Sequence, residues 1–349
     1  MPRYLAFPAP EKGPSLAVVL VNLGTPDAPD AASVRRYLSD FLSDPRVVEQ
    51  PRWLWWLILH GFVLRVRPAR SARAYQSIWT ADGSPLQVGT CQLASRLDAR
   101  LQELAPGRVR VLHAMRYGAP SLADTLARLA GEGMQRLLVV PLFPQFSATT
   151  TASVLDALGR VLARWRRPPE LRFVSDYHAD EMHIDALARS VQAHWQTHGR
   201  GERLLLSFHG IPQRYVENGD PYLDQCRATA AALQARLGIE DQQVIVCFQS
   251  RVGREPWLQP YFDATLDALP AQGVRSVDVL SPGFAVDCLE TLEEIAMRGR
   301  DSFLKAGGEK FHFIACLNDS DDQVQALASL IRRQCAGWPE FSARLVDPA

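Results

Sequence analysis

His209 is the first residue of this chain whose type and position could do chemistry. It follows the apolar residues 204–206 and precedes Gly210 and Pro212, so it stands in a stiff turn at the exit of an expected strand. Imidazole titrates near physiological pH and can bind a metal ion or transfer protons. A single histidine is more often a structural residue that bonds its own turn, and the local sequence leaves both roles open.

A group of carboxylates in residues 281–296, SPGFAVDCLETLEEIA, could supply a partner for this histidine. Asp287 has the position of a helix N-cap, with Glu290 three residues later as its capping-box partner. Glu290 and Glu294 lie four residues apart on one helical face, where two carboxylates can hold a divalent cation or relay protons. A favourable interaction with the helix dipole explains the same residues, so these readings stay open.

Apolar runs alternating with helical patterns must position these residues. The runs, rich in Val, Leu and Ile, are typical of strands covered on both faces, and they lie at 16–23, 109–117, 134–143, 171–177, 202–210, 242–250, 274–284 and 310–318. The pattern predicts an α/β protein of two Rossmann-like lobes, each a parallel sheet with helices on both faces. Chemistry in such sheets lies beyond the carboxyl ends of the strands, where His209 and Asp287 fall.

The charges and paired prolines of residues 163–170 predict the boundary between the two lobes. We expect a first lobe formed by residues 15–165 and by 320–349, where a final helical pattern returns to it. Residues 170–319 would form the second lobe, which would carry the metal and proton site.

Composition excludes several classes of function. The 349 residues contain 38 Lys and Arg and 38 Asp and Glu, so no net charge attracts nucleic acid, and no nucleic-acid partner is expected. The six cysteines form no CxxC pair, which argues against a zinc ribbon or a closely spaced iron–sulfur site. The start of the chain has no signal-peptide pattern, and no apolar run is long enough to span a membrane, so a cytoplasmic protein is expected.

Several blocks together resemble the ferrochelatase family, over about residues 18–330. They are, in order, VNLGTPD, YQSIWTADGSPL (75–86), MRYGAP, VVPLFPQFSATTTAS, LLSFHGIPQRYVENGDPY, CFQSRVG, SPGFAVDCLETLEEI and CLNDSDD. The SFHGIP block and the PGF..D..ET.EE block are specific in combination. The resemblance implies an enzyme, a lyase that inserts Fe²⁺ into a porphyrin to give haem.

The resemblance also implies a set of site residues. His209 and Glu290 would face each other across the porphyrin as metal ligands or proton-handling groups, with Asp287 and Glu294 extending the acidic side. The porphyrin cleft would further contain three residues from the first lobe, namely Arg116, Tyr117 and Ser147.

Metal insertion must remove two pyrrole protons while the ring is bent and the ion sheds its ligands. Our hypothesis is that His209 takes these protons and that Glu290, backed by Asp287 and Glu294, forms an acidic path. Fe²⁺ and protoporphyrin IX are expected as substrates, and haem as product, with no tightly bound cofactor. Animal members of the family that the sequence resembles carry an iron–sulfur cluster on a Cys-rich C-terminal extension, and because only Cys335 lies in the corresponding part of this sequence, no cluster is expected. In the family that the sequence resembles, the branch that acts on coproporphyrin often has a tyrosine after the GTP turn and a less apolar lip. Asp27 at that position and the apolar segment 51–68 therefore imply protoporphyrin IX.

Residues 51–68, PRWLWWLILHGFVLRVRP, combine three tryptophans with flanking arginines. A core helix is one interpretation. The other is an apolar lip of the porphyrin cleft that also makes peripheral contact with the inner face of a membrane, which would suit poorly soluble substrates.

Three alternatives remain at this stage. A porphyrin or haem carrier without turnover would share the cleft but would not need Glu290 and Glu294. A chelatase for another tetrapyrrole, such as coproporphyrin, or for cobalt or nickel would share the fold. A hydrolase using Ser207 with His209 is the third, although no GxSxG motif is present.

Overall fold

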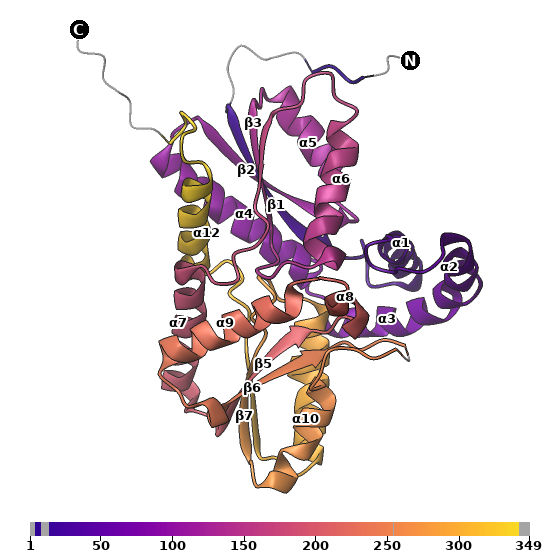
Figure 1. Ribbon diagram of the computed structural model, residues 1–349, viewed down its shortest axis with the longest axis vertical. Helices are drawn as coiled ribbons and strands as arrows, with labels where there is room; N and C mark the ends of the chain where they lie inside the picture. The colour runs from indigo at the N-terminus through magenta and orange to yellow at the C-terminus, as the bar shows by residue number, and fades with distance from the viewer. Residues whose placement is uncertain (1–3, 8–13, 254, 342–349) are drawn as a thin grey trace.

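Eight strands form two separate parallel sheets, as the sequence predicted. The computed structural model describes residues 4–7, 14–253 and 255–341 (Figure 1). The first sheet has the order β2-β1-β3-β4 and consists of β1 (Leu16–Gly24), β2 (Val109–Tyr117), β3 (Arg136–Pro141) and β4 (Glu170–Phe173). The second has the order β6-β5-β7-β8 and consists of β5 (Arg203–His209), β6 (Val244–Gln249), β7 (Ser276–Leu280) and β8 (Lys310–Ile314).

Helices cover both faces of the first sheet because its central strand is apolar on both sides. Residues 16, 18 and 20 of β1 face one core, and residues 17, 19 and 21 face the other. Helices α4 (Pro85–Leu104) and α12 (Asp321–Gln334) contribute to the first core, and α5 (Leu122–Gly131) and α6 (Ser153–Leu162) to the second.

The second sheet is built in the same way. Helices α7 (Glu181–His198) and α9 (Tyr222–Leu237) pack on one face, with the short α8 (Gln213–Glu217) nearby. The other face is covered by α10 (Phe262–Ala268), the π-helix η5 (Glu290–Gly299) and α11 (Arg300–Lys305). Single 3₁₀ turns, η3 (Asp241–Gln243) and η4 (Pro270–Gln272), precede β6 and β7.

The expected start of the second lobe at residue 170 is wrong. Residues 170–173 form β4, which pairs in parallel with β3 and so belongs to the first sheet. The charges and prolines just before it therefore make the turn from α6 to β4, and the chain crosses to the second lobe between β4 and α7. Helix α12 packs in the core of the first lobe, and the rest of the proposed division stays a prediction.

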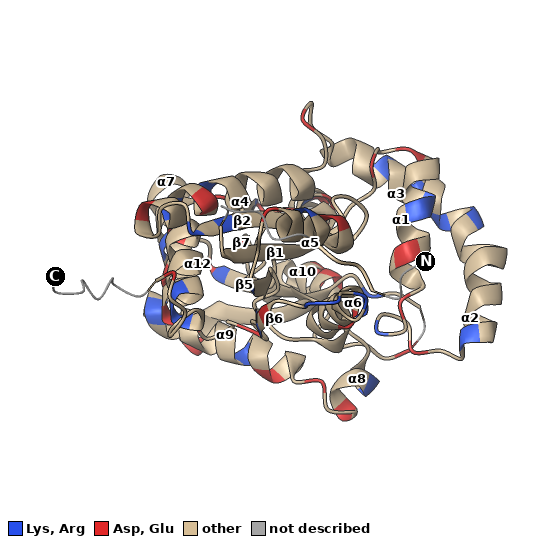
Figure 2. Ribbon diagram, turned by 90° about the horizontal axis from the view of Figure 1, so that it is seen from above, with Lys and Arg blue, Asp and Glu red and all other residues tan. Residues whose placement is uncertain are grey.

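A helical arm projects from the side of the molecule (Figures 1 and 2). It contains α1 (Ala31–Leu42), α2 (Arg52–Ile58), the π-helical turn η1 (Leu59–Val63) and α3 (Leu64–Ile78). The sequence left open whether residues 51–68 form a core helix, and the structure answers in part. Leu59 and Leu64 are buried in the arm's own core, whereas Trp53 and Phe62 are 71% and 65% exposed. No helix within the described residues is long and apolar enough to cross a membrane.

Candidate functional site

His209 is the last residue of β5, at the carboxyl edge of the second sheet, and it is half-buried. Its Nδ1 lies 2.6 Å from the carbonyl oxygen of Gly210. Because a carbonyl only accepts hydrogen bonds, Nδ1 carries the hydrogen, and Nε2 carries the lone pair. No group among the described residues bonds Nε2, so this atom remains free to accept a proton or bind a metal ion.

Gly210 is needed for this arrangement. Its N–H donates to the carbonyl of Gln249 at 2.8 Å. A Cβ atom at this position would lie 2.9 Å from the same carbonyl oxygen and 3.1 Å from the ring of Trp257. Any other residue would therefore push the histidine turn away from β6.

Glu290 begins the π-helix η5, a rare helical form that is frequent at functional sites. The side chain is half-buried and lies close to the thiol of Cys288. Burial raises the pKa of Cys288 well above its usual value, and the charge of Glu290 raises it further, so the thiol stays protonated. Burial and the same carboxylate raise the pKa of Tyr75, which places Glu290 beside the aromatic core of the helical arm.

Gln249 joins the histidine and glutamate sides of the site. It is the last residue of β6 and the register partner of His209. Its amide donates to the carbonyl of Glu290 at 2.9 Å and accepts from the hydroxyl of Ser207 at 2.7 Å. The sequence placed this residue at a strand end, in the CFQSRVG block, but gave no indication of its role.

The same bonds argue against a serine hydrolase. Ser207 is fully buried, and its hydroxyl is already bonded to Gln249. It therefore has no access to a substrate carbonyl.

Glu294 is held by the loop after β6. Its carboxylate accepts from the backbone N–H of Ser250 at 2.8 Å and from the Ser250 hydroxyl at 2.6 Å, and Arg298 lies 4.0 Å away. Ser250 has a φ of 66°, which is unfavourable for a serine. Both donors meet one carboxylate in this conformation, so Glu294 anchors η5 to β6 behind Glu290.

Asp287 is buried, and both oxygens of its carboxylate accept hydrogen bonds from neighbouring groups. It accepts from Asn318 at 2.8 Å, from the hydroxyl of Thr291 at 2.9 Å and from the N–H of Cys316 at 3.3 Å. The expected capping box with Glu290 does not form, because the π-helix starts at Glu290 itself and Thr291 binds Asp287 instead. The bonds connect the start of η5 to the segment after β8.

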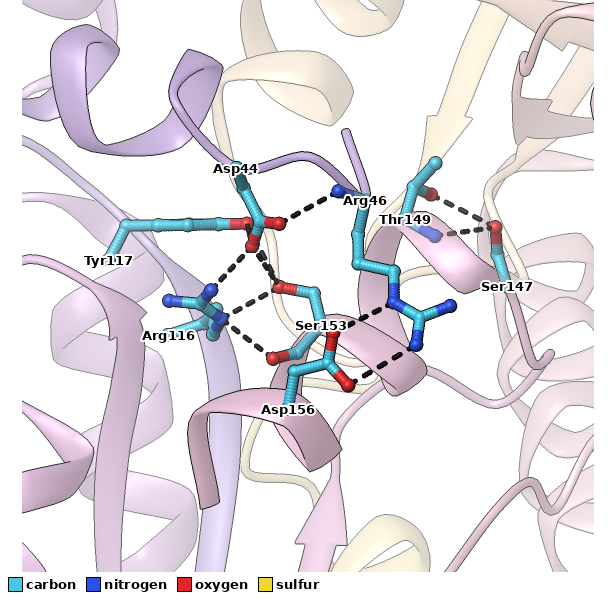
Figure 3. A network of polar contacts seen from close by, with 8 residues as sticks. All are labelled: Asp44, Arg46, Arg116, Tyr117, Ser147, Thr149, Ser153 and Asp156. Atoms are coloured by element: carbon cyan, nitrogen blue, oxygen red, sulfur yellow. Dashed lines mark hydrogen bonds and ion pairs between the residues drawn. The ribbon is translucent and has the colours of Figure 1, made fainter. Parts of the chain in front are cut away.

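Arg116 and Tyr117, at the carboxyl end of β2, belong to a buried polar network (Figure 3). Asp44 forms a salt bridge with Arg116 and accepts from the hydroxyls of Tyr117 at 2.8 Å and Ser153 at 2.6 Å. Burial opposes ionisation of Asp44, but these hydrogen bonds and the arginine charge outweigh it, and the pKa of Asp44 is lowered. The network fixes α6 and the loop after α1 against β2.

Ser147 precedes the π-helical turn η2 (Ala148–Ala152) and is buried. Its hydroxyl caps this turn by accepting from the N–H of Thr149 (Figure 3), and it donates to Asp220 at 3.0 Å. The preceding Gln145 donates to Thr229 of α9 at 2.9 Å. This segment therefore joins the two lobes.

The structure thus divides the predicted site residues into two groups. His209, Glu290 and Glu294 gather around Gln249 at the carboxyl edge of the second sheet. Residues 116, 117 and 147 lie at the carboxyl edge of the first sheet, and the side chain of each takes part in structural bonds. Tyr117 packs in the same aromatic cluster as Tyr75, which connects the two groups.

Two four-stranded parallel sheets with helices on both faces define a two-lobed chelatase-like fold. The structure of SirB from Bacillus subtilis with Fe³⁺ has this fold, with a TM-score of 0.54, 13% identity and coverage of 92% of this chain and 96% of that one. CbiX, described as the terminal enzyme of sirohaem synthesis in denitrifying bacteria, gives a TM-score of 0.51 at 15% identity, covering 90% of this chain and 98% of its own. At such identities the likeness concerns the fold alone.

Sequence comparison gives the family. The ferrochelatase family model matches residues 15–335. Ferrochelatase of Thioalkalivibrio sulfidiphilus is 53% identical over 93% of this chain and 88% of its own length, and that of Methylibium petroleiphilum is 55% identical over 95% and 91%. The chain belongs to the ferrochelatase family, and it is accordingly an enzyme, a lyase of haem biosynthesis, rather than a porphyrin carrier without turnover.

Proposed function

We propose that this enzyme inserts Fe²⁺ into protoporphyrin IX at the edge of the second sheet, between His209 and Glu290. Iron enters the ring as both pyrrole protons leave, so the site must accept two protons per turnover. Nε2 of His209 accepts the first, because Nδ1 already carries a hydrogen that it donates to Gly210. This bonding pattern is the observation that carries the proposal.

Glu290 is the second functional group. Its carboxylate lies at the start of η5, and it either coordinates the incoming ferrous ion or takes up a proton, both of which suit a half-buried carboxylate. Glu294 holds η5 in place through Ser250 and extends the acidic side. We assign Asp287 a positioning role, since its three hydrogen bonds leave its carboxylate little capacity for protons or metal.

The test is anaerobic mixing of the protein with protoporphyrin IX and Fe²⁺, followed through the Soret band. His209→Ala and Glu290→Gln are each expected to lower the insertion rate by at least about 100-fold, a typical loss for a missing general base. Porphyrin binding, measured by fluorescence quenching, should be retained. His178→Ala is the matched control, because His178 also pairs with a neighbouring group, Asp176 at 2.7 Å, but lies outside the site. Near-normal turnover of His209→Ala would refute the assignment.

We further propose that the arm formed by α2, η1 and α3 contacts a membrane surface from the cytoplasmic side. Trp53, Trp56 and Phe62 are 71%, 59% and 65% exposed, and further apolar side chains beside them, Leu57, Ile58 and Val66, are also exposed. Arg52 is the first residue of α2, next to this apolar surface, where it can meet anionic headgroups.

Flotation with anionic vesicles tests this contact. Trp53→Ser with Trp56→Ser should abolish co-flotation, whereas Leu155→Ser, an exposed apolar position on α6, should not change it. Trp55 is a poor choice for this test, because its ring N–H donates to the carbonyl of Leu42 at 2.6 Å and holds the arm together. Equal flotation of the double variant and the parent would exclude this surface.

Protoporphyrin IX is proposed over the more carboxylated coproporphyrin because the arm is apolar and because Asp27 carries a negative charge. Asp27 is exposed and only weakly engaged by Arg36 at 3.2 Å. Additional propionates near such a carboxylate would be repelled. Parallel insertion assays with the two porphyrins test the preference, and iron analysis of the purified protein tests the expected absence of an iron–sulfur cluster.

A further inference from the structure

A second group of metal-ligating side chains lies on the α7 face of the second sheet. Asp278 of β7 is paired in register with His312 of β8, and His194 of α7 packs over them. Asp278 is also the register partner of Leu204 near the start of β5, whereas His209 ends that strand. Five residues of strand, about 16 Å, therefore separate this group from the site described above.

The two oxygens of Asp278 have different surroundings. The carboxylate is fully buried, and Oδ2 accepts from the ring N–H of Trp195 at 2.6 Å and from the N–H of Gly201 at 2.8 Å. Oδ1 faces two imidazoles, with Nδ1 of His312 at 3.2 Å and Nε2 of His194 at 3.9 Å. One oxygen is thus bound by the protein framework, and the other is directed at both histidines.

Nε2 of His194 is buried and has no hydrogen-bond partner among the described residues. Leaving such an atom unsatisfied costs about 1–3 kcal/mol. At 3.9 Å, Oδ1 of Asp278 is too far away to satisfy it by a hydrogen bond. A cation between the two atoms would satisfy the nitrogen and neutralise the buried carboxylate together.

We propose that His194, Asp278 and His312 bind a divalent cation of the Zn²⁺ or Co²⁺ type, at a site separate from the one that inserts iron. Two imidazoles and one carboxylate are a typical zinc ligand set. In a tetrahedral zinc site the ligand atoms are about 3.3 Å apart, from metal–ligand bonds of about 2.0–2.1 Å. Here one atom from each residue lies within 4.8 Å of the other two, so small side-chain movements close the site.

A water molecule or His198 can supply the fourth ligand. The ring of His198 stacks on that of His194 with centroids 4.4 Å apart, and it lies 5.6 Å from the ring of His312. The bound cation would fasten α7 to β7 and β8. Because it binds the folded state, it would raise the unfolding temperature, by an amount that grows with the logarithm of the ratio of free cation to its Kd.

Metal binding is measured on the full-length protein carrying His209→Ala and Glu290→Gln, so that binding at the proposed insertion site does not contribute. After treatment with a chelator, the protein is titrated with Co²⁺, and the visible d–d absorption and the stoichiometry are recorded. Zn²⁺ is then added to displace the Co²⁺. One equivalent of Co²⁺ with a tetrahedral spectrum is expected, together with a higher unfolding temperature in Zn²⁺.

Variants identify the ligands. His194→Gln and His312→Ala should each weaken Co²⁺ binding by at least tenfold and remove the tetrahedral bands, whereas His178→Ala should leave both unchanged. The change to Gln keeps most of the volume at the buried position, and circular dichroism checks that each variant is folded. In the parent enzyme, His194→Gln should insert iron at the normal rate. Absence of a tetrahedral Co²⁺ spectrum, or unchanged affinity in both ligand variants, would overturn the proposal.

Discussion

Gln249→Leu is the change that best tests how the site is held together. The side chain is 2% exposed, and its loss removes the hydrogen bonds to the Ser207 hydroxyl and to the carbonyl of Glu290. Each group that is left without a partner costs about 1–3 kcal/mol, so we expect the free energy of unfolding to fall by about 2–6 kcal/mol. Leu has a similar volume, so no large cavity adds to this loss.

The effect on catalysis should exceed the effect on substrate binding. Gln249 holds the first residue of η5 next to the end of β5, and a shift of about 1 Å between His209 and Glu290 can lower a rate by about 100-fold. We expect kcat for iron insertion to fall about 10- to 100-fold, while the KM for porphyrin changes little. Anaerobic initial rates over a range of porphyrin concentrations separate the two constants.

Two further variants isolate the cause. Gln249→Glu can still accept from Ser207 but cannot donate to the Glu290 carbonyl, so it should lose activity like the Leu variant. Gln102→Leu also removes two hydrogen bonds, to the carbonyl of Val109 and the N–H of Gly107, but at a less buried position at the opposite end of the first sheet. It should lose stability and keep kcat. If the Gln249→Leu variant has the same kcat as the Gln102→Leu variant, Gln249 does not position the catalytic groups.

Three other changes test the packing of the two lobes by urea unfolding. Asp44→Asn leaves Arg116 buried without its charge partner and should lower the free energy of unfolding by about 3–5 kcal/mol. Because folding lowers the pKa of Asp44, its carboxylate should stabilise the fold above about pH 4, and this stabilisation should disappear as the pH falls through the pKa of Asp44 in the folded protein. Burial lowers the pKa of His183 from 6.5 to about 4, so on acidification the unfolded state binds a proton before the folded state does. The free energy of unfolding should therefore fall by about 2 kcal/mol from pH 7 to pH 5, and His183→Phe should remove this pH dependence. Ser250→Gly and Ser250→Ala both lose the hydroxyl bond to Glu294, but only Gly accepts a φ of 66° without strain. The Gly variant should therefore be more stable than the Ala variant by about 1 kcal/mol, and equal stabilities would show that the positive φ carries no strain.

The architecture could be predicted from the sequence because it depends on local periodicity. All eight apolar runs became strands in the expected order, since a strand covered on both faces has to be apolar throughout. The error at residues 163–170 has a local cause as well. Charges and prolines mark a turn, but they do not tell whether the next strand joins the same sheet or another, which depends on pairing with β3 far away in the chain.

The candidate site could be predicted only as a set of residue types at strand ends. The sequence does not show which carboxylate has free capacity, because this depends on partners distant in the chain. Asn318 lies 31 residues from Asp287, and Ser250 lies 44 residues from Glu294. The role of Gln249 could not be predicted for the same reason, because its two hydrogen-bond partners lie 42 residues before it and 41 residues after it in the chain.

The carboxylates of residues 287–294 therefore have different roles, although their spacing in the sequence does not distinguish them. Asp287 and Glu294 each accept from two or more donors, which ties the start of η5 to the segment after β8 and its middle to the loop after β6. Between them, the carboxylate of Glu290 accepts no hydrogen bond from a backbone N–H, amide or hydroxyl group among the described residues, so most of its lone pairs are available. Across Gln249, His209 has one ring nitrogen committed to a carbonyl and the other free. A reaction that moves a cation in and two protons out requires such a pair of groups, each rigidly held and each with unused capacity.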